Sequence, residues 1–302
     1  MKRVYRSRSI KRTRRTRAQI ATIKEWIEVI LFQIKPATVR QLFYQLTSNG
    51  VIEKTEAQYK STVIRLLSRM RREKEIPFDW IADNTRWMRK PSSYSSLEAM
   101  LENTARTYRR SVWDSQDAYV EIWLEKDALA GVFYQVTQRW DVPLMVTRGF
   151  SSLSFLHTAA EEIKDQSARG KETFIYYFGD HDPSGRVNDR VIERDLREFA
   201  DGVDFHFERM AVTLEQIAEW SLPSRPTKTR GTHAKTFKGD SVELDSIPPK
   251  QLESLIEFCI TQHIYEPAYN ALIAAEQSER ETLVAFISTF KGNGSDGDFL
   301  TV

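Results

Sequence analysis

Short apolar runs alternate with amphipathic segments through the middle of the chain. Residues 119–124 and 174–178 are rich in aromatic and β-branched side chains, which is typical of strands buried in a sheet. A further strand is predicted at 144–147, and helices are predicted at 127–140 and 152–168. Strands that alternate with helices form a mostly parallel sheet, so this pattern predicts an α/β domain.

The first part of the chain shows helical periodicity instead. Apolar residues recur at helical spacing between 20 and 34, and Thr38 is a suitable cap for the next helix. A third helix is predicted at 55–74, and a short strand and turn at 76–81. Three helices followed by a β-wing predict a winged helix-turn-helix domain, in which one helix approaches the major groove of DNA.

A length of 302 residues suits two modest domains with cores of their own. The expected fold class is α/β, with an N-terminal winged-helix domain before a parallel α/β domain and C-terminal helices. The regions are a basic flexible arm at 1–17, the winged-helix domain at 18–90, a linker and helix at 91–115, the α/β domain at 116–247, C-terminal helices at 248–290 and a flexible tail at 291–302.

Positive charge is concentrated at the start of the chain. The formal net charge is +2, but residues 1–17 contain nine basic residues and no acidic ones. Such a block does not pack against itself, and we expect it to neutralise DNA phosphates; a solubilising or targeting tail is the alternative. A stripe of arginines on the third helix has either a DNA-binding role or that of a solvated face. The candidate DNA contacts are Lys2, Arg3, Arg12, Arg14, Arg15, Arg65, Arg69 and Arg72.

Carboxylates follow both of the main predicted strands. Glu125 comes directly after the first, and Asp180 and Asp182 follow the second. Ligands of parallel α/β sheets bind beyond the carboxyl ends of the strands, so these three side chains are expected on one rim. Clustered carboxylates repel each other, and a hard divalent cation, most simply Mg²⁺, relieves that repulsion.

A tyrosine and an arginine share one face of the second predicted helix. Arg40 and Tyr44 are four residues apart. A phenol with a pKa near 10 is a poor nucleophile at neutral pH, and a guanidinium beside it favours the phenolate and also binds a phosphate. Attack on phosphorus is one role for this pair, and ordinary packing of a helical tyrosine is the other.

Five further residues are candidate supports for the site. Gly149 could let a phosphate approach a helix N-terminus, although glycines are common in turns. Glu243 and Asp245 could support a second metal or lie on the surface. The remaining two are Lys126, which follows Glu125, and Arg148, which precedes Gly149.

These motifs resemble a known family. Leu124-Glu125-Lys126-Asp127 and Gly179-Asp180-His181-Asp182-Pro183-Ser184-Gly185 resemble the Toprim domain, and Thr38-Val39-Arg40-Gln41-Leu42-Phe43-Tyr44 resembles the tyrosine motif of the topoisomerase VI A subunit family. This family includes the meiotic double-strand-break protein and the short mini-A forms of plasmids and phages. The chain departs from the motif at Gln41, where the family usually has Asp or Glu.

The resemblance implies a DNA-cleaving transesterase. Tyr44 would form a 5′-phosphotyrosyl link, Arg40 would orient the phosphate, and Glu125, Asp180 and Asp182 would hold Mg²⁺. Cutting both strands of duplex DNA implies a homodimer, and strand passage would require a separate B-type ATPase subunit.

Two other functions fit the same motifs. A Toprim metal nuclease would use water in place of Tyr44, and a catalytically silent DNA-binding protein would need neither the tyrosine nor the metal. The chain has a single cysteine and no apolar stretch long enough to span a membrane. We therefore expect a cytoplasmic protein that meets DNA, in a prokaryotic, plasmid or phage setting, with no membrane partner.

Overall fold

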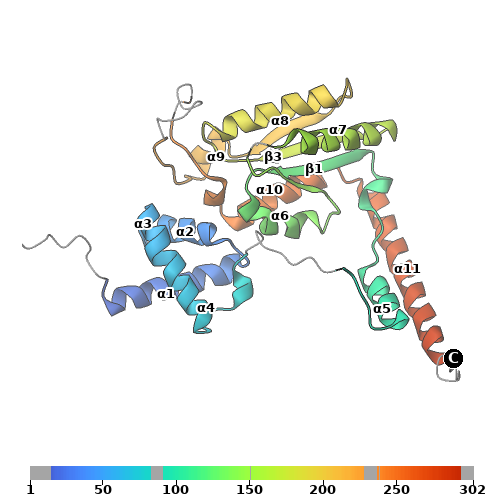
Figure 1. Cartoon of the computed structure of the whole chain (residues 1–302), viewed down its shortest axis with the longest axis horizontal. Helices are drawn as coiled ribbons and strands as arrows, with labels where there is room; N and C mark the ends of the chain where they lie inside the picture. Colours follow the sequence, from blue (N-terminus) through green and yellow to red (C-terminus); the bar gives the residue numbers. More distant parts are fainter. Residues whose placement is uncertain (1–14, 83–90, 150, 228–236, 238, 294–302) are drawn as a thin grey trace, which may run out of the picture. The chain divides into compact units, whose positions relative to one another are not determined.

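The chain divides into two compact units, Met1–Ala82 and Asp83–Val302. The computed structural model, drawn in Figure 1, describes residues 15–82, 91–149, 151–227, 237 and 239–293. The predicted domain boundary at residue 90 and most of the predicted tail lie outside these residues. None of the helices in the described ranges is long and apolar enough to cross a membrane.

The N-terminal unit is helical. Its elements are α1 (Arg17–Ile34), α2 (Val39–Ser48), α3 (Glu56–Gln58), a π-helical segment η1 (Tyr59–Ile64), α4 (Arg65–Arg72) and a 3₁₀ turn η2 (Phe78–Trp80). The third predicted helix is thus continuous but contains a π-helical stretch. Ile27 and Leu31 of α1 pack with Leu42 of α2 and with Leu67 and Met70 of α4 in one buried core.

The first two helices begin with capping boxes. The Thr38 hydroxyl accepts a hydrogen bond from the Gln41 backbone at 3.1 Å, and the Gln41 side chain accepts one from the Thr38 backbone at 2.9 Å. Thr16 and Gln19 form the same arrangement at the start of α1. Glutamine and glutamate both complete such a box. The departure from the family motif at Gln41 therefore preserves the start of α2.

The strand predicted at 76–81 is wrong. Phe78–Trp80 forms a 3₁₀ turn, and only Ile81 pairs with another segment, through an isolated bridge to Ala37. Pro77 fixes its own φ at −63° and has no N–H to contribute to a ladder. The described residues of this unit therefore contain helices without the β-wing.

The second unit is an α/β structure built on a four-stranded parallel sheet. The strands are β1 (Ala118–Leu124), β2 (Leu144–Val146), β3 (Glu172–Phe178) and β4 (His206–Ala211), in the spatial order β2-β1-β3-β4. Three of the strands agree with the sequence prediction. The edge strand β4 was not predicted.

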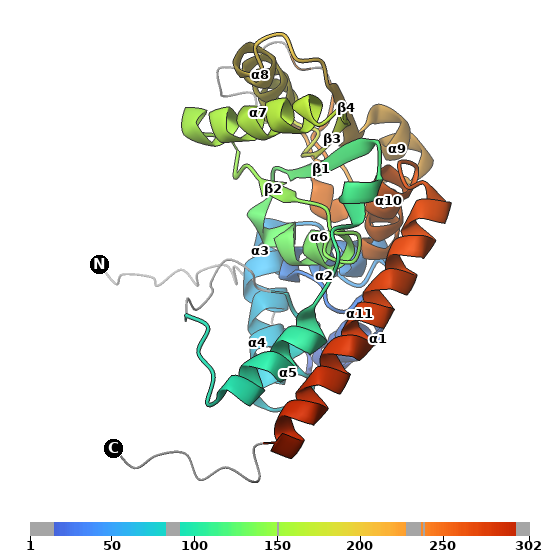
Figure 2. The same ribbon diagram turned by 90° about the vertical axis from the view of Figure 1, so that its right-hand side faces the viewer.

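Helices cover both faces of the sheet, as Figures 1 and 2 show. The elements that follow β1 are η4 (Asp127–Leu129), α6 (Ala130–Thr137), α7 (Leu153–Ala168), α8 (Gly185–Phe199), α9 (Leu214–Glu219), η5 (Leu244–Ser246) and α10 (Pro249–Thr261). Helices α7 and α8 pack on the face that carries Trp123 and Tyr177. Helices α6 and α10 pack on the opposite face, around Ile122 and Phe178.

A pair of helices extends from this unit. Helix α11 (Glu266–Asn293) packs against α5 (Leu97–Thr107), and the turn η3 (Val112–Ser115) leads from α5 towards β1. The Tyr108 hydroxyl donates a hydrogen bond to Glu279 at 2.8 Å, and Arg280 donates one to the Tyr108 carbonyl at 2.6 Å. Hydrogen bonds therefore join α11 to Tyr108, the residue that follows α5.

Candidate functional site

The carboxyl ends of β1 and β3 bring two of the predicted carboxylates together. Glu125 follows β1 directly, and its backbone N–H donates to the carbonyl of Phe178 at 2.9 Å. Its side-chain Oε2 accepts a hydrogen bond from the backbone N–H of Asp180 at 3.0 Å. Residues 55 positions apart thus meet at one rim of the sheet.

The loop from Gly179 to Gly185 holds Asp180 and Asp182 in a tight turn. The Asp182 carboxylate accepts a hydrogen bond from the Gly185 N–H at 2.8 Å. A Cβ at position 179 would lie 2.5 Å from Oε2 of Glu125, and one at position 185 would lie 2.2 Å from the carbonyl oxygen of Asp180. A side chain at position 185 would therefore displace the backbone, whereas one at position 179 would displace the side chains of Glu125 and Tyr177.

Arg209 of β4 holds this loop in place, and sequence reasoning missed it. Its guanidinium donates to the carbonyls of Gly179 at 2.8 Å and Asp180 at 2.6 Å. It also forms an ion pair with Asp189 of α8 at 2.7 Å, in which both side chains are 8% exposed. Since the predicted strands did not include β4, no sequence signal placed this arginine near the site.

Lys126 gathers a second set of carboxylates next to the first. Its Nζ lies 3.3 Å from Asp180 Oδ1, 3.3 Å from Glu243 Oε2 and 2.5 Å from Asp245 Oδ2. The backbone of His181 pairs with that of Val242, which brings the segment containing Glu243 and Asp245 to the rim. Both residues are buried, so they do not occupy the surface position that the sequence left open for them.

Burial and mutual repulsion shape the electrostatics of the site. Burial, with a further contribution from Asp180, raises the pKa of Glu125 to about 7. Burial also raises the pKa of Asp180, and Lys126 opposes that shift. Burial alone would lower the pKa of Lys126, but Asp245, Asp180 and Glu243 together raise it well above its usual range. The raised pKa of Glu125 therefore reflects burial first and the neighbouring carboxylate of Asp180 second.

The donor set at the rim suits a hard cation, although its side chains are not arranged around one. Within the described residues, no group of three or more His, Cys, Asp or Glu side chains is placed so that it could hold a metal ion. Asp180 and Asp182 each use one carboxylate oxygen in their hydrogen bonds to other described residues. The buried Oδ1 of Asn188 has no hydrogen-bond partner there, and its Nδ2 lies 3.5 Å from Glu125. Carboxylate and amide oxygens are the ligands that Mg²⁺ prefers, so the chemistry of the donors fits this ion. The side chains would have to turn to surround it.

Arg148 and Gly149 follow the neighbouring strand β2. The exposed Arg148 donates to Asp127 at 3.3 Å, close in sequence to Glu125. Gly149 has a φ of +87°, which favours glycine, and a Cβ there would meet open space. The N-terminus of α7 is already capped, since the Ser152 hydroxyl accepts a hydrogen bond from the Phe155 backbone at 3.3 Å.

Tyr44 lies inside the N-terminal unit. Only 2% of the residue is exposed, and its ring packs 5.6 Å from that of Phe43. The ammonium of Lys54 lies 5.0 Å from the centre of the Tyr44 ring, while the Arg40 guanidinium lies 4.6 Å above the ring of Tyr59. Lys54 is thus a cation near the tyrosine that sequence reasoning did not identify.

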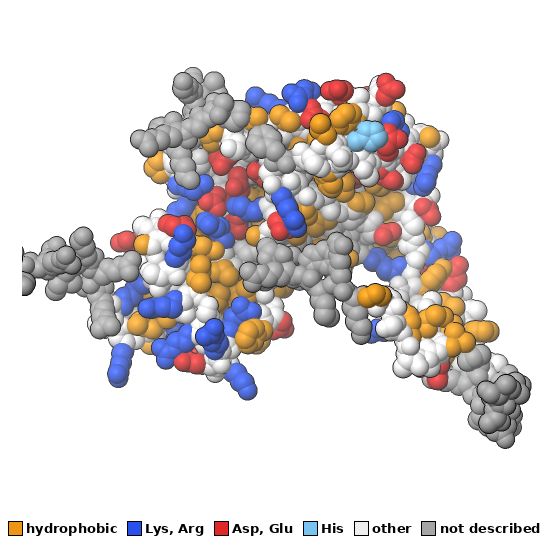
Figure 3. All heavy atoms as spheres, in the orientation of Figure 1, with side chains coloured by type: hydrophobic (Ala, Val, Ile, Leu, Met, Phe, Trp, Pro, Cys, Tyr) orange, Lys and Arg blue, Asp and Glu red, His pale blue; other side chains and the backbone are white. Residues whose placement is uncertain are grey.

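The predicted arginine stripe forms an exposed face of α4. Arg65, Arg69 and Arg72 are all exposed, and Arg69 pairs with Glu73 at 2.7 Å. Figure 3 shows Lys and Arg side chains over this unit. Arg15 is anchored instead, because it donates to Thr62 at 2.6 Å and to Gln58 at 2.8 Å. The other candidate contacts in the arm, which are Lys2, Arg3, Arg12 and Arg14, lie outside the described residues.

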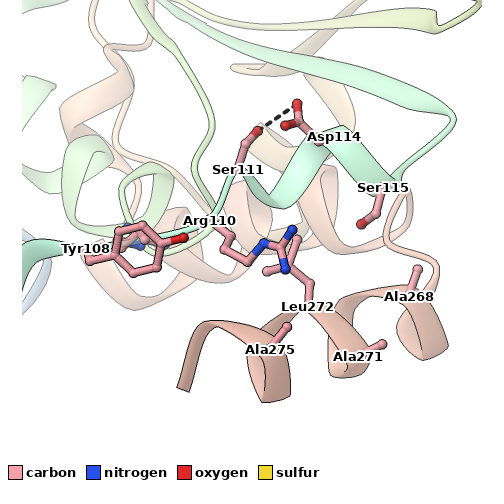
Figure 4. A pocket seen from close by; sticks show the side chains of 10 residues that line it. Tyr108, Arg110, Ser111, Asp114, Ser115, Ala268, Ala271, Leu272 and Ala275 are labelled. Carbon is pink, nitrogen blue, oxygen red and sulfur yellow. Dashed lines mark hydrogen bonds between the residues drawn. The ribbon is translucent and has the colours of Figure 1, made fainter. Parts of the chain in front are cut away.

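A separate hollow lies beside α11, as Figure 4 shows. It is lined by Tyr108, Arg109, Arg110, Ser111, Asp114, Ser115, Ala268, Ala271, Leu272 and Ala275. Ser111 donates to Asp114 at 3.1 Å across its edge. The carboxylate of Asp114 is the one acidic group in this lining, in contrast to the acidic rim of the sheet.

The rim of the sheet is therefore the stronger candidate for chemistry, and the N-terminal unit is the stronger candidate for binding a polyanion.

Comparisons of the chain with protein-family models, with curated proteins and with solved structures found no match.

Proposed function

We propose that the chain is a DNA-cleaving transesterase similar to the topoisomerase VI A subunit, with a helical, DNA-binding N-terminal unit and a Toprim-like second unit. The observation that carries this proposal is the convergence of Glu125 and Asp180, with Asp182 in the same loop, at one rim of a parallel sheet. The motif around Tyr44 and the exposed arginines of α4 support it.

The chemistry starts from the tyrosine. The Tyr44 oxygen attacks a backbone phosphorus, a 5′-phosphotyrosyl bond forms, and the bond from phosphorus to the 3′ oxygen breaks, so that the leaving oxygen takes up a proton. Lys54, whose ammonium lies 5.0 Å from the centre of the Tyr44 ring, adds a positive charge near the tyrosine. Arg40 on the same helix binds the phosphate after it leaves the Tyr59 ring.

The carboxylates supply the cation site. Glu125, Asp180 and Asp182 would hold Mg²⁺, which when bound stabilises negative charge on the phosphate and on the leaving oxygen. Cleavage of both strands needs two tyrosines and therefore a homodimer on duplex DNA. A B-type ATPase subunit would be needed for strand passage.

The burial of Tyr44 favours a second candidate function. A residue that is 2% exposed must move outwards before it can attack DNA. A metal nuclease that activates water would need no such movement, because its machinery is confined to the rim of the sheet. The two functions differ in whether the cut DNA becomes attached to the protein.

One gel separates them. Duplex DNA labelled at its 3′ ends is incubated with the full chain and Mg²⁺, the protein is denatured, and the label is followed. We expect label on the wild-type protein and none on Tyr44→Phe, while the matched control Tyr59→Phe keeps it. If Tyr44→Phe cuts DNA as fast as the wild type, the nuclease is the correct assignment.

A further inference from the structure

Lys126 divides the acidic rim into two halves. Its ammonium contacts three carboxylates, Asp180, Glu243 and Asp245, at 3.3, 3.3 and 2.5 Å. An ammonium has three donors and one positive charge, so this contact uses its full hydrogen-bonding capacity. The side chain is 23% exposed, which places it inside the site rather than on the open surface.

In the half around Lys126, the negative charges of Glu243 and Asp245 are already balanced by cations of the chain. Glu243 has one oxygen 3.3 Å from Lys126 and the other 3.4 Å from the Arg225 guanidinium. The Asp245 side chain is fully buried against the same ammonium. The backbone N–H of Leu244, between them, donates to Asp180 at 2.8 Å, so the segment is fixed to the rim. If the Lys126 ammonium moved away, the buried carboxylates of this half would be left without a compensating charge. That cost keeps the lysine in place.

The half around Glu125 is less fully compensated: the nearby Arg209 guanidinium favours the charged form of Glu125, but it donates its hydrogen bonds to the backbone carbonyls of Gly179 and Asp180. Among the described residues, neither Glu125 nor Asp182 forms an ion pair. Glu125 receives only the Asp180 N–H at 3.0 Å and the Asn188 amide at 3.5 Å, and Asp182 receives the Gly185 N–H at 2.8 Å. Asp180 lies between the halves and contacts Lys126 through Oδ1.

We propose that the rim takes a single divalent cation, bound by Glu125, Asp180 and Asp182, and that Lys126 occupies the place where a second cation would bind to Glu243 and Asp245. This inference rests on the proposed function. Two-metal sites that act on phosphate esters place their ions about 3.5–4 Å apart. The Lys126 ammonium supplies a fixed positive charge between Glu243 and Asp245, and it also contacts Asp180, which belongs to the proposed metal half.

Metal stoichiometry tests this proposal without any measurement of cleavage. The full chain is titrated with Mn²⁺, and bound ion is counted by electron paramagnetic resonance of the free ion. We expect one Mn²⁺ per wild-type chain and two per chain for Lys126→Met, which keeps the length of the side chain but removes its charge. Lys126→Arg keeps a cation at the position and should stay at one.

A double variant checks the location of the added ion. Lys126→Met combined with Asp245→Asn should return to one Mn²⁺ per chain, and it also relieves the repulsion that could unfold the single variant. Two ions in the wild type, or one in a folded Lys126→Met chain, would overturn the inference and leave the proposed function intact. No bound ion in the wild type would overturn both.

Discussion

A methyl group added at Gly185 should distort the acidic loop by a predictable amount. In Gly185→Ala the new Cβ would lie 2.2 Å from the Asp180 carbonyl oxygen, whereas ordinary contact begins at 3.4 Å. The two groups must therefore separate by about 1.2 Å. The same carbonyl accepts the Arg209 hydrogen bond at 2.6 Å, which a shift of that size would break or strain.

The expected effects follow from this displacement. Overpacking of this kind costs about 1–3 kcal/mol of folding free energy. For a unit of this size, each kcal/mol lowers Tm by roughly 2–4 °C. Displacement of a catalytic group by about 1 Å can lower the rate about 100-fold. We therefore expect a Tm several degrees lower and a much larger proportional loss of Mg²⁺-dependent cleavage.

The assay compares thermal unfolding and cleavage in Gly185→Ala with those in Gly170→Ala. Gly170 precedes β3, at the other end of the sheet, and has a φ of +78°, with no atom within 4 Å of the place that a Cβ would take. Alanine there is destabilising through its backbone conformation alone. We expect it to lower Tm and leave cleavage near the wild-type rate. Equal loss of cleavage in both variants, or no loss in Gly185→Ala, would refute the account of the loop.

Three further predictions concern other parts of the chain. Asp182→Asn should abolish Mg²⁺-dependent cleavage and preserve DNA affinity in a filter-binding assay; an unchanged rate would exclude Asp182 as a ligand. Deletion of residues 1–14 removes seven cations, and should flatten the slope of log K against log salt by about 0.9 for each phosphate that the arm neutralises; an unchanged slope would mean that the arm does not touch DNA. Burial raises the pKa of Glu121 to about 7, so the free energy of unfolding should fall as the pH rises from about 4.5 towards 7, because the folded state keeps the proton to a higher pH. Denaturant titrations of Glu121→Gln should show a smaller fall over this pH range, and an equal fall in both proteins would contradict the assignment.

The sequence predicts the parts of the fold that depend on local pattern. Strands β1 and β3 are rich in apolar residues and are buried on both faces of the sheet, so they can be recognised without knowing their partners. Strand β4 is an edge strand whose side chains are mostly exposed or half-buried, and it shows no apolar run. The segment around Pro77 combines aromatic and apolar residues like a strand, but its proline starts a 3₁₀ turn.

The candidate site divides in the same way. Glu125 and Asp180 could be placed on one rim because each follows a predicted strand. The ion pairs of Lys126 with Glu243 and Asp245 depend on backbone pairing between His181 and Val242, which are far apart in sequence and carry no local signal. The burial of Tyr44 likewise depends on how the helices pack, since helical spacing alone does not reveal which hydroxyl reaches solvent.

The most direct test of the central claim is to identify the atom that becomes attached to cut DNA. The wild-type chain is incubated with duplex DNA and Mg²⁺ and denatured, the DNA is trimmed with nuclease, and the protein is digested for mass spectrometry. The account predicts a peptide in which Tyr44 carries a nucleotide through its 5′ phosphate, and the same peptide unmodified in Asp182→Asn. Cut DNA with free 5′-phosphate ends and no nucleotide on any tyrosine would contradict it.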